Sequence, residues 1–184
     1  MEVKGLAIVS TLEWVKKNHG EEAELEIRSQ LKEEEQQMLA FDGCKALWYP
    51  FDLYKRISVL VMNKYGGGDV KFLRQIGAYT AEHDKTIIPK LFYKIGTPQF
   101  IIRLGTWGFR RYFSEGNVTV RESHKGKVLF EIYKTPIVDP VYYERIAGWM
   151  TRAIELSGGK NVKSVVEVRE EGGSEIILFT NTWE

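Results

Sequence analysis

The chain has 184 residues, a formal net charge of +1 and a hydrophobic content of 43%. This hydrophobic content excludes a disordered chain, and a charge near zero speaks against nucleic-acid binding, which favours a basic excess. The single cysteine, Cys44, excludes a disulfide framework or a thiolate zinc site, and we interpret it as an incidental thiol. The sequence has no apolar run of membrane-span length and no signal-type leader, so we expect a cytoplasmic protein.

The first half of the chain reads as a series of helices. Ser10 and Glu13 have the spacing of a capping box and predict a helix start. Residues 21–30 and 32–40 predict two acidic helices. Pro50 opens a further helix that ends at the glycines 66–68. Apolar residues lie on all sides of this helix, which is typical of a buried, central element.

Capping signals predict the next helices. We expect a helix over 69–83 capped by Asp69, a short helix over 85–95, and a helix over 99–113 introduced by Thr97 and Pro98.

After residue 114 the hydrophobic period changes from helical spacing to alternation. Residues 118–133 and 162–182 predict two β-hairpins. Between them a helix follows Pro140, with one apolar stripe and with Glu144, Arg145 and Arg152 on its other side. A helix between two hairpins needs a sheet to cover. We therefore predict one α+β domain over 1–184, in which a helical part (1–113) packs on a four-stranded antiparallel sheet of ββαββ order (114–184).

Three stretches carry a resemblance to a known family. They are FLRQIGAYTAEHD (72–84), FYKIGTPQFIIRLGTWGFRRYFSEGNVTV (92–120) and ERIAGWMTRAIELSGGKNV (144–162). The chain resembles a paralogous family of unknown function from myxobacteria. That family is similar to a superfamily containing the 4-vinyl-reductase-type domains, the haem nitric-oxide sensor domains and the TRAPP vesicle-transport subunits.

The resemblance implies a hydrophobic pocket between the helices and the sheet, and binding in place of catalysis. It also implies frequent dimerisation and a role in signalling. The sequence departs from the patterns of this superfamily in two ways, which limit the expected cofactors. The haem-ligating histidine of the sensors would fall near Gly108, and the residues 165–183 lack the cysteines of the 4-vinyl-reductase type. We therefore expect no haem by the histidine scheme, no metal and no other cofactor.

Aromatic residues on these helices are candidates for the pocket wall, because apolar pockets use ring faces with a few polar anchors. The candidates are Trp107, Trp149, Tyr79, Phe92, Phe100, Phe109 and Tyr112. The alternative is that they form an ordinary core.

Gly105 and Gly108 interrupt a helical run, at a cost of roughly 0.5–1 kcal/mol each relative to alanine. They either leave room for a ligand or allow a close approach of another helix. His83 either faces the pocket as a ligand or binds the last carbonyls of its own helix. Arg103, Arg110 and Arg111 either bind an anion or pair with the acidic N-terminal helices.

The leading hypothesis is a sensor or regulatory module of bacterial signalling that binds a small apolar or lipid-like molecule. The alternative is a ligand-free interaction or dimerisation module, similar in role to the vesicle-transport subunits. Its docking face would hold Ile177, Phe179 and Trp183. We find no catalytic triad, carboxylate pair or metal cluster in the sequence, so we expect no enzyme.

Overall fold

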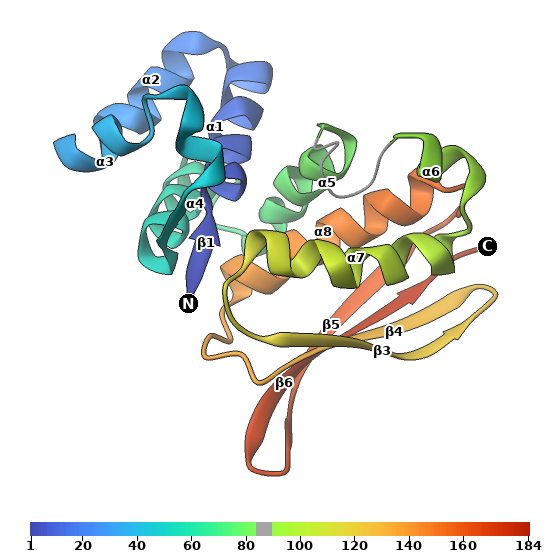
Figure 1. The fold of residues 1–184 in the computed structure, drawn as a ribbon. Coiled ribbons are helices and arrows are strands. Elements are labelled where there is room, and N and C mark those ends of the chain that lie inside the picture. The colour runs from blue at the N-terminus through green and yellow to red at the C-terminus, as the bar shows by residue number, and fades with distance from the viewer. Residues whose placement is uncertain (84–89) are drawn as a thin grey trace.

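In the computed structural model, which describes residues 1–83 and 90–184, helices cover one face of a four-stranded antiparallel sheet (Figure 1). The predicted α+β fold class is therefore confirmed. Along the sheet the order is β3 (Asn117–His124), β4 (Lys127–Tyr133), β6 (Ser174–Thr182) and β5 (Lys163–Glu171). The two predicted hairpins meet through the central pair β4 and β6, where Phe130 lies opposite Phe179. That the whole chain forms one domain stays a prediction.

Helix α8 (Pro140–Leu156) lies across the sheet (Figure 1). It begins at Pro140 as predicted, and Asp139 Oδ1 caps it by accepting a hydrogen bond of 2.8 Å from the Val141 N–H. Its end is followed by Gly158, whose φ of +97° suits glycine. The predicted polar side of α8 is wrong at Glu144 and Arg145, which are both buried because other helices cover this side as well.

Three helices lie beside or near α8. They are α5 (Leu73–His83), which follows the short 3₁₀ turn η2 (Val70–Phe72), α6 (Lys90–Ile95) and α7 (Pro98–Tyr112). Asp69 caps the 3₁₀ turn, and Thr97 Oγ1 accepts from the Phe100 N–H as predicted. The predicted start of the short helix at residue 85 lies outside the described residues.

Helices α5 and α8 cross at glycines. A Cβ on Gly77 would lie 2.0 Å from the Arg145 carbonyl oxygen, and one on Gly148 would lie 2.1 Å from the Arg74 carbonyl oxygen. Both distances are far inside van der Waals contact, so the backbones touch at this crossing and alanine does not fit at either position.

A smaller helical unit forms the N-terminal part. It consists of α1 (Gly5–His19), α2 (Glu21–Ser29), α3 (Glu33–Met38), the 3₁₀ turn η1 (Asp42–Ala46) and α4 (Phe51–Tyr65), with a two-stranded sheet of β1 (Glu2–Lys4) and β2 (Trp48–Pro50). This small sheet was not predicted, because strands of three residues show no alternation that can be distinguished from a loop.

Three sequence expectations are wrong here. Ser10 does not cap a helix, since α1 begins at Gly5 and the Ser10 hydroxyl donates to the Ala7 carbonyl within it. Helix α4 is not buried on all sides, because Lys55, Arg56 and other polar residues face solvent. The proposed docking face is also not exposed: Ile177 and Phe179 are fully buried beneath the helices.

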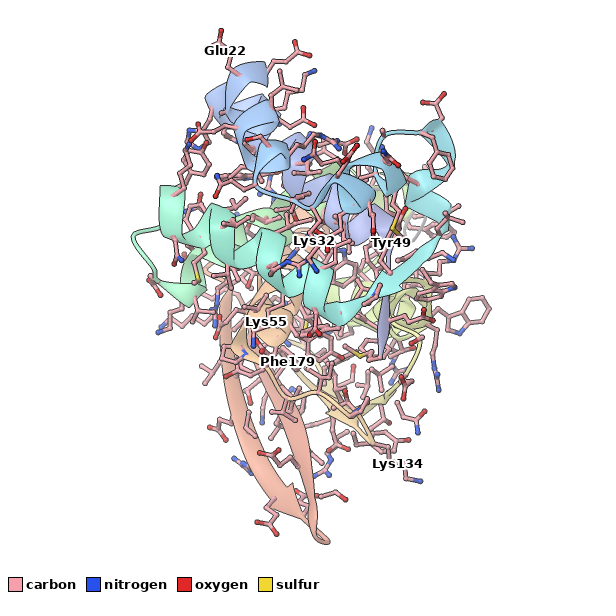
Figure 2. The ribbon with its side chains drawn as sticks, turned by 90° about the vertical axis from the view of Figure 1, so that its left-hand side faces the viewer. Glu22, Lys32, Tyr49, Lys55, Lys134 and Phe179 are labelled. Carbon is pink, nitrogen blue, oxygen red and sulfur yellow. The ribbon has the colours of Figure 1, made fainter. Side chains whose placement is uncertain are left out.

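One hydrophobic cluster runs from Val3 of β1 to Phe179 of β6 and joins both parts. Figure 2 shows Tyr49 and Phe179, both fully buried, inside a shell that includes the exposed side chains of Glu22 and Lys134. Within the part of the chain that the structure describes, none of the helices combines the length and the apolar character that crossing a membrane requires.

Candidate functional site

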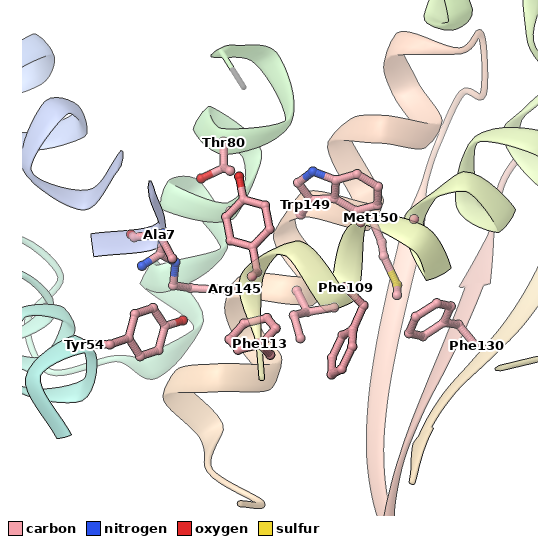
Figure 3. Close-up of a pocket in the computed structure, with 14 residues that line it drawn as sticks. Ala7, Tyr54, Thr80, Phe109, Phe113, Phe130, Arg145, Trp149 and Met150 are labelled. Carbon is pink, nitrogen blue, oxygen red and sulfur yellow. The ribbon is translucent and has the colours of Figure 1, made fainter. Parts of the chain in front are cut away.

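A cavity of about 80 Å³ lies between the helices, where α5, α7 and α8 meet β4 and the N-terminal part (Figure 3). It is partly open to solvent. Helices α5 and α8 contribute Gly77, Thr80, Arg145, Ile146, Trp149 and Met150 to its wall. The remaining lining residues are Ala7, Tyr54, Gly105, Gly108, Phe109, Tyr112, Phe113 and Phe130.

Five of the residues singled out in the sequence line this cavity: Gly105, Gly108, Phe109, Tyr112 and Trp149. Four of them lie on one face of α7, and Trp149 faces them from α8. Phe109 and Tyr112 are buried. These residues therefore face the cavity, and their role toward a ligand stays a prediction.

The opposite face of α7 carries residues that were also expected in the pocket. Trp107 is 84% exposed and Phe100 is 42% exposed, and neither lines the cavity. Phe92, on α6, is also exposed and contacts Phe100 at a ring distance of 6.1 Å. The sequence named Phe100 and Trp107 as pocket candidates, but both lie on the side of α7 that faces away from the cavity. It cannot tell which side of an isolated helix faces the core when both sides carry rings.

Tyr79 and His83 lie on α5, away from the cavity wall. Their rings stack at 4.0 Å. His83 Nδ1 lies 2.9 Å from the Tyr79 carbonyl oxygen, and Nε2 lies 3.2 Å from Lys17 Nζ. Because the ammonium can only donate, Nε2 accepts and Nδ1 donates to the carbonyl. This geometry matches the helix-end interpretation of His83 and not the pocket ligand.

Gly105 makes room for a side chain of the protein. A Cβ at this position would lie 3.0 Å from two ring atoms of Trp149. The indole of Trp149 therefore packs against the α7 backbone and closes one side of the cavity. The close approach that Gly105 allows also forms a wall of the cavity, and its role toward a ligand stays a prediction.

The arginine cluster of α7 does not join the N-terminal helices through Arg110. Arg110 Nη2 donates to Asn117 Oδ1 at 2.7 Å, and Nη1 donates to the Ser114 carbonyl at 3.4 Å. Arg110 therefore links the end of α7 to the start of β3. Cys44 is a buried free thiol in η1 and is not part of the cavity wall.

Three polar lining residues were missed by the sequence interpretation: Tyr54, Thr80 and Arg145. Arg145 had been placed on the solvent side of α8, and Tyr54 had been counted as core. Thr80 Oγ1 donates to the Ile76 carbonyl at 2.9 Å, which satisfies it within α5. The sequence signal that could have revealed Arg145 is its place near the glycines of the helix crossing, where a second helix covers α8.

Electrostatics at Tyr54 reflect its surroundings. Burial raises the pKa of the Tyr54 hydroxyl above its ordinary value, and the nearby Arg145 guanidinium partly opposes this rise. The guanidinium also lies 5.0 Å from the centre of the Tyr54 ring, a cation–π distance. Tyr54 therefore presents a neutral hydroxyl and ring to the charged end of the cavity.

Comparison with known proteins shows which solved structures share this fold. No family model and no curated protein matches the chain. An unliganded Fe(II) H-NOX protein from K. algicida matches with a TM-score of 0.71 at 14% identity, over 98% of this chain and 97% of that chain. The chain has an H-NOX-like fold. The resemblance to the myxobacterial family stays a prediction.

Two further solved structures agree with this fold. A mutant of T. tengcongensis H-NOX matches with a TM-score of 0.64 at 13% identity, over 98% of this chain and 97% of that chain. An oxygen-binding H-NOX domain related to soluble guanylate cyclases matches with a TM-score of 0.62 at 12% identity, over 98% and 95% of the two chains. At such identities the likeness concerns the fold alone.

Haem, which the H-NOX fold implies, does not fit the residues present. His19 and His124 are exposed, His83 binds its own helix, and none of the three histidines lines the cavity. Among residues 1–83 and 90–184 there is also no group of three His, Cys, Asp or Glu residues that could hold a metal ion. The Trp149 ring also lies between α7 and α8, against Gly105.

Proposed function

We propose that this protein is a ligand-binding sensor or regulatory module that encloses a small, largely apolar molecule in the cavity, without haem. The observation that carries this proposal is the cavity itself, which lies where the helices meet the sheet and is walled by Trp149, Met150, Phe109, Phe113 and Phe130. Cavities of this kind, lined by rings with few polar groups, are typical of small-molecule sites. The H-NOX-like fold supports a sensory role by analogy only.

The cavity volume sets the size of the ligand. One water molecule needs about 10–15 Å³ of such volume, so a cavity of about 80 Å³ has room for a molecule of several heavy atoms. Binding would come mainly from burial of apolar surface, at about 25 cal/mol per Å² removed from water. We propose a cytoplasmic role in signalling, in which a ligand that favours one arrangement of the helices shifts the population toward it.

The test is a binding screen on the purified protein. A panel of small neutral, anionic and cationic molecules with apolar bodies is scanned by thermal unfolding, and hits are confirmed by native mass spectrometry. We expect at least one class to raise the melting temperature in a dose-dependent manner. Haemin added to the same protein is expected to give no Soret band of a bound haem.

A cavity-filling variant makes the screen specific for this site. Gly108 is buried and lines the cavity, so Gly108→Leu places a side chain in the ligand space. Arg103→Leu adds the same side chain on the exposed side of the same helix and serves as the control. We expect G108L to lose binding and R103L to retain it. A ligand that binds G108L as well as the wild type would place the site elsewhere, and a panel without any hit would contradict the proposal.

A further inference from the structure

Arg145 is a buried cation in the cavity wall. Its side chain is only 6% exposed. Nη1 donates to Thr11 Oγ1 at 2.8 Å, and Nη2 donates to the Ala7 carbonyl at 3.1 Å and to Ser10 Oγ at 3.2 Å. All three acceptors are neutral groups of α1. These bonds hold the guanidinium in place without neutralising its charge.

The other charged residues of α8 have charged partners. Glu144 Oε2 lies 2.5 Å from Arg74 Nε, and Arg152 Nη1 lies 2.8 Å from Glu155 Oε2. For Arg145 no carboxylate within ion-pair distance is present among residues 1–83 and 90–184. A buried charge without an opposite charge is costly, and proteins rarely keep one unless it is paired or serves a ligand.

The guanidinium also has donors left. Arginine carries five N–H groups in a planar fork, and the three bonds to α1 use three of them. Within the described part of the chain, the Nε–H and the second Nη1–H have no charged acceptor, and the Tyr54 hydroxyl that interacts with the guanidinium is neutral. The Nε–H and the second Nη1–H point away from each other around the guanidinium, so each can give a carboxylate oxygen one charge-assisted hydrogen bond.

The cavity has two chemically different ends (Figure 3). Arg145, Tyr54 and Thr80 lie together at the end that faces α1 and α4. Trp149, Met150 and Phe130 lie at the end that faces the sheet. A ligand that satisfies both ends must carry an anionic head and an apolar body.

From these observations we infer that the ligand of this cavity is a small apolar carboxylate whose acid group binds Arg145 and whose hydrocarbon body lies among Trp149, Met150 and Phe130. This inference rests on the proposed ligand-binding function and specifies the ligand class. A carboxylate brings one negative charge to one guanidinium. A phosphate monoester would bring about 1.5–2 charges and leave part of them unpaired beside rings, and an amine would be repelled.

Hexanoate and its neutral counterpart hexanol test the inference on the wild-type protein. Binding of each is measured by isothermal titration calorimetry at neutral pH. We expect hexanoate to bind at least about tenfold more tightly, since hydrogen bonds between charged groups are stronger than those of a hydroxyl. Equal binding of the two, or tighter binding of hexanol, would overturn the inference while leaving the proposed function intact.

Substitution of the arginine completes the test. Arg145→Met removes the charge and keeps an unbranched side chain. Arg145→Lys keeps the charge, and it serves as the second variant if R145M does not fold. We expect R145M to weaken hexanoate about tenfold to a hundredfold and to leave hexanol within about threefold. R145K is expected to retain the preference for the acid over the alcohol. A preference for hexanoate that survives in R145M would overturn the assignment of Arg145.

Arg152→Gln is the matched control, because Arg152 lies on the same helix but pairs with Glu82 and Glu155 outside the cavity wall. R152Q is expected to bind hexanoate like the wild type. If R152Q loses hexanoate as R145M does, the effect is one of general charge and the inference is overturned. If neither hexanoate, hexanol nor any other molecule of the screen binds the wild type, both the proposed function and the carboxylate inference are overturned.

Discussion

Helix α8 makes two contrasting contacts with its neighbours. Against α5 its backbone touches the other backbone, because Gly77 and Gly148 remove the side chains at the crossing. Against α7 the contact is made by the Trp149 side chain, and the cavity lies beside that ring. The same helix therefore has one contact in which any added methyl group would collide and another in which there is space.

The contrast shows why two glycines of one fold differ in how well they tolerate an added side chain. Gly148 faces a carbonyl oxygen of Arg74, which cannot move without displacing the backbone of α5. Gly105 faces the edge of an indole, which can shift into the neighbouring cavity. Close approach to backbone is rigid, whereas close approach to a side chain beside a cavity can be relieved.

The largest expected effect comes from breaking the tight contact. Gly148→Ala places a Cβ 2.1 Å from the Arg74 carbonyl oxygen and should force α5 away from α8. We expect a loss of about 3 kcal/mol in the free energy of unfolding, measured by urea denaturation. Gly105→Ala is the matched substitution at the loose contact. There the gain in helix propensity offsets the shift of Trp149, and the change should stay within about 1 kcal/mol. Equal losses in the two variants would contradict the distinction.

The next effect compares two tryptophans. Trp149 is half-buried and closes the cavity, whereas Trp107 is 84% exposed on the outer face of α7. We expect Trp149→Ala to lower the free energy of unfolding by about 2 kcal/mol, less than for a fully buried ring, and to weaken ligand binding. Trp107→Ala should change stability by no more than about 0.5 kcal/mol and leave binding unaltered. A reversed order would place the cavity on the wrong face of α7.

The smallest expected effect concerns Tyr142, a fully buried ring on α8 that lies 4.7 Å from the ring of Phe113. Its hydroxyl has no hydrogen-bond partner among the described residues. Tyr142→Phe should therefore stabilise the protein by about 1 kcal/mol near neutral pH, measured by urea denaturation. A clear loss of stability would reveal a partner for the hydroxyl.

The same residue predicts a pH dependence. Burial raises the pKa of the Tyr142 hydroxyl well above its ordinary value. Above a pH of about 10 the unfolded chain releases this proton while the folded protein retains it, so stability is complete below that pH and falls as the pH rises further. Y142F should flatten this alkaline decline. Tyr143→Phe, whose pKa is raised less, should flatten it less.

Much of the fold could be predicted because local signals and burial agree. The Asp139-Pro140 start of α8, the Thr97 cap of α7 and the two alternating hairpins all lie where the sequence placed them. The failures arise where tertiary context decides. Ser10 has the spacing of a cap but lies inside α1, and the strands β1 and β2 are too short to show a period.

The site was predictable only in part, for the same reason. The sequence named Gly105, Gly108, Phe109 and Tyr112 as candidates for the pocket wall, and all four line the cavity. It also named Phe100 and Trp107, which are exposed, because only the packing against α8 decides which face of α7 is buried. Arg145 was assigned to solvent because a charged residue is usually exposed, and only the crossing of α5 and the contact with α1 bury it.

The glycine crossing also limits how this protein can move. Two helices whose backbones touch behave as one rigid body, because neither can slide or rotate without a collision. Arg145 lies at this crossing and reaches across to α1, where its hold consists of three hydrogen bonds from a single side chain. A ligand that displaces either helix from the cavity side would thus move α5 and α8 together relative to the N-terminal helices.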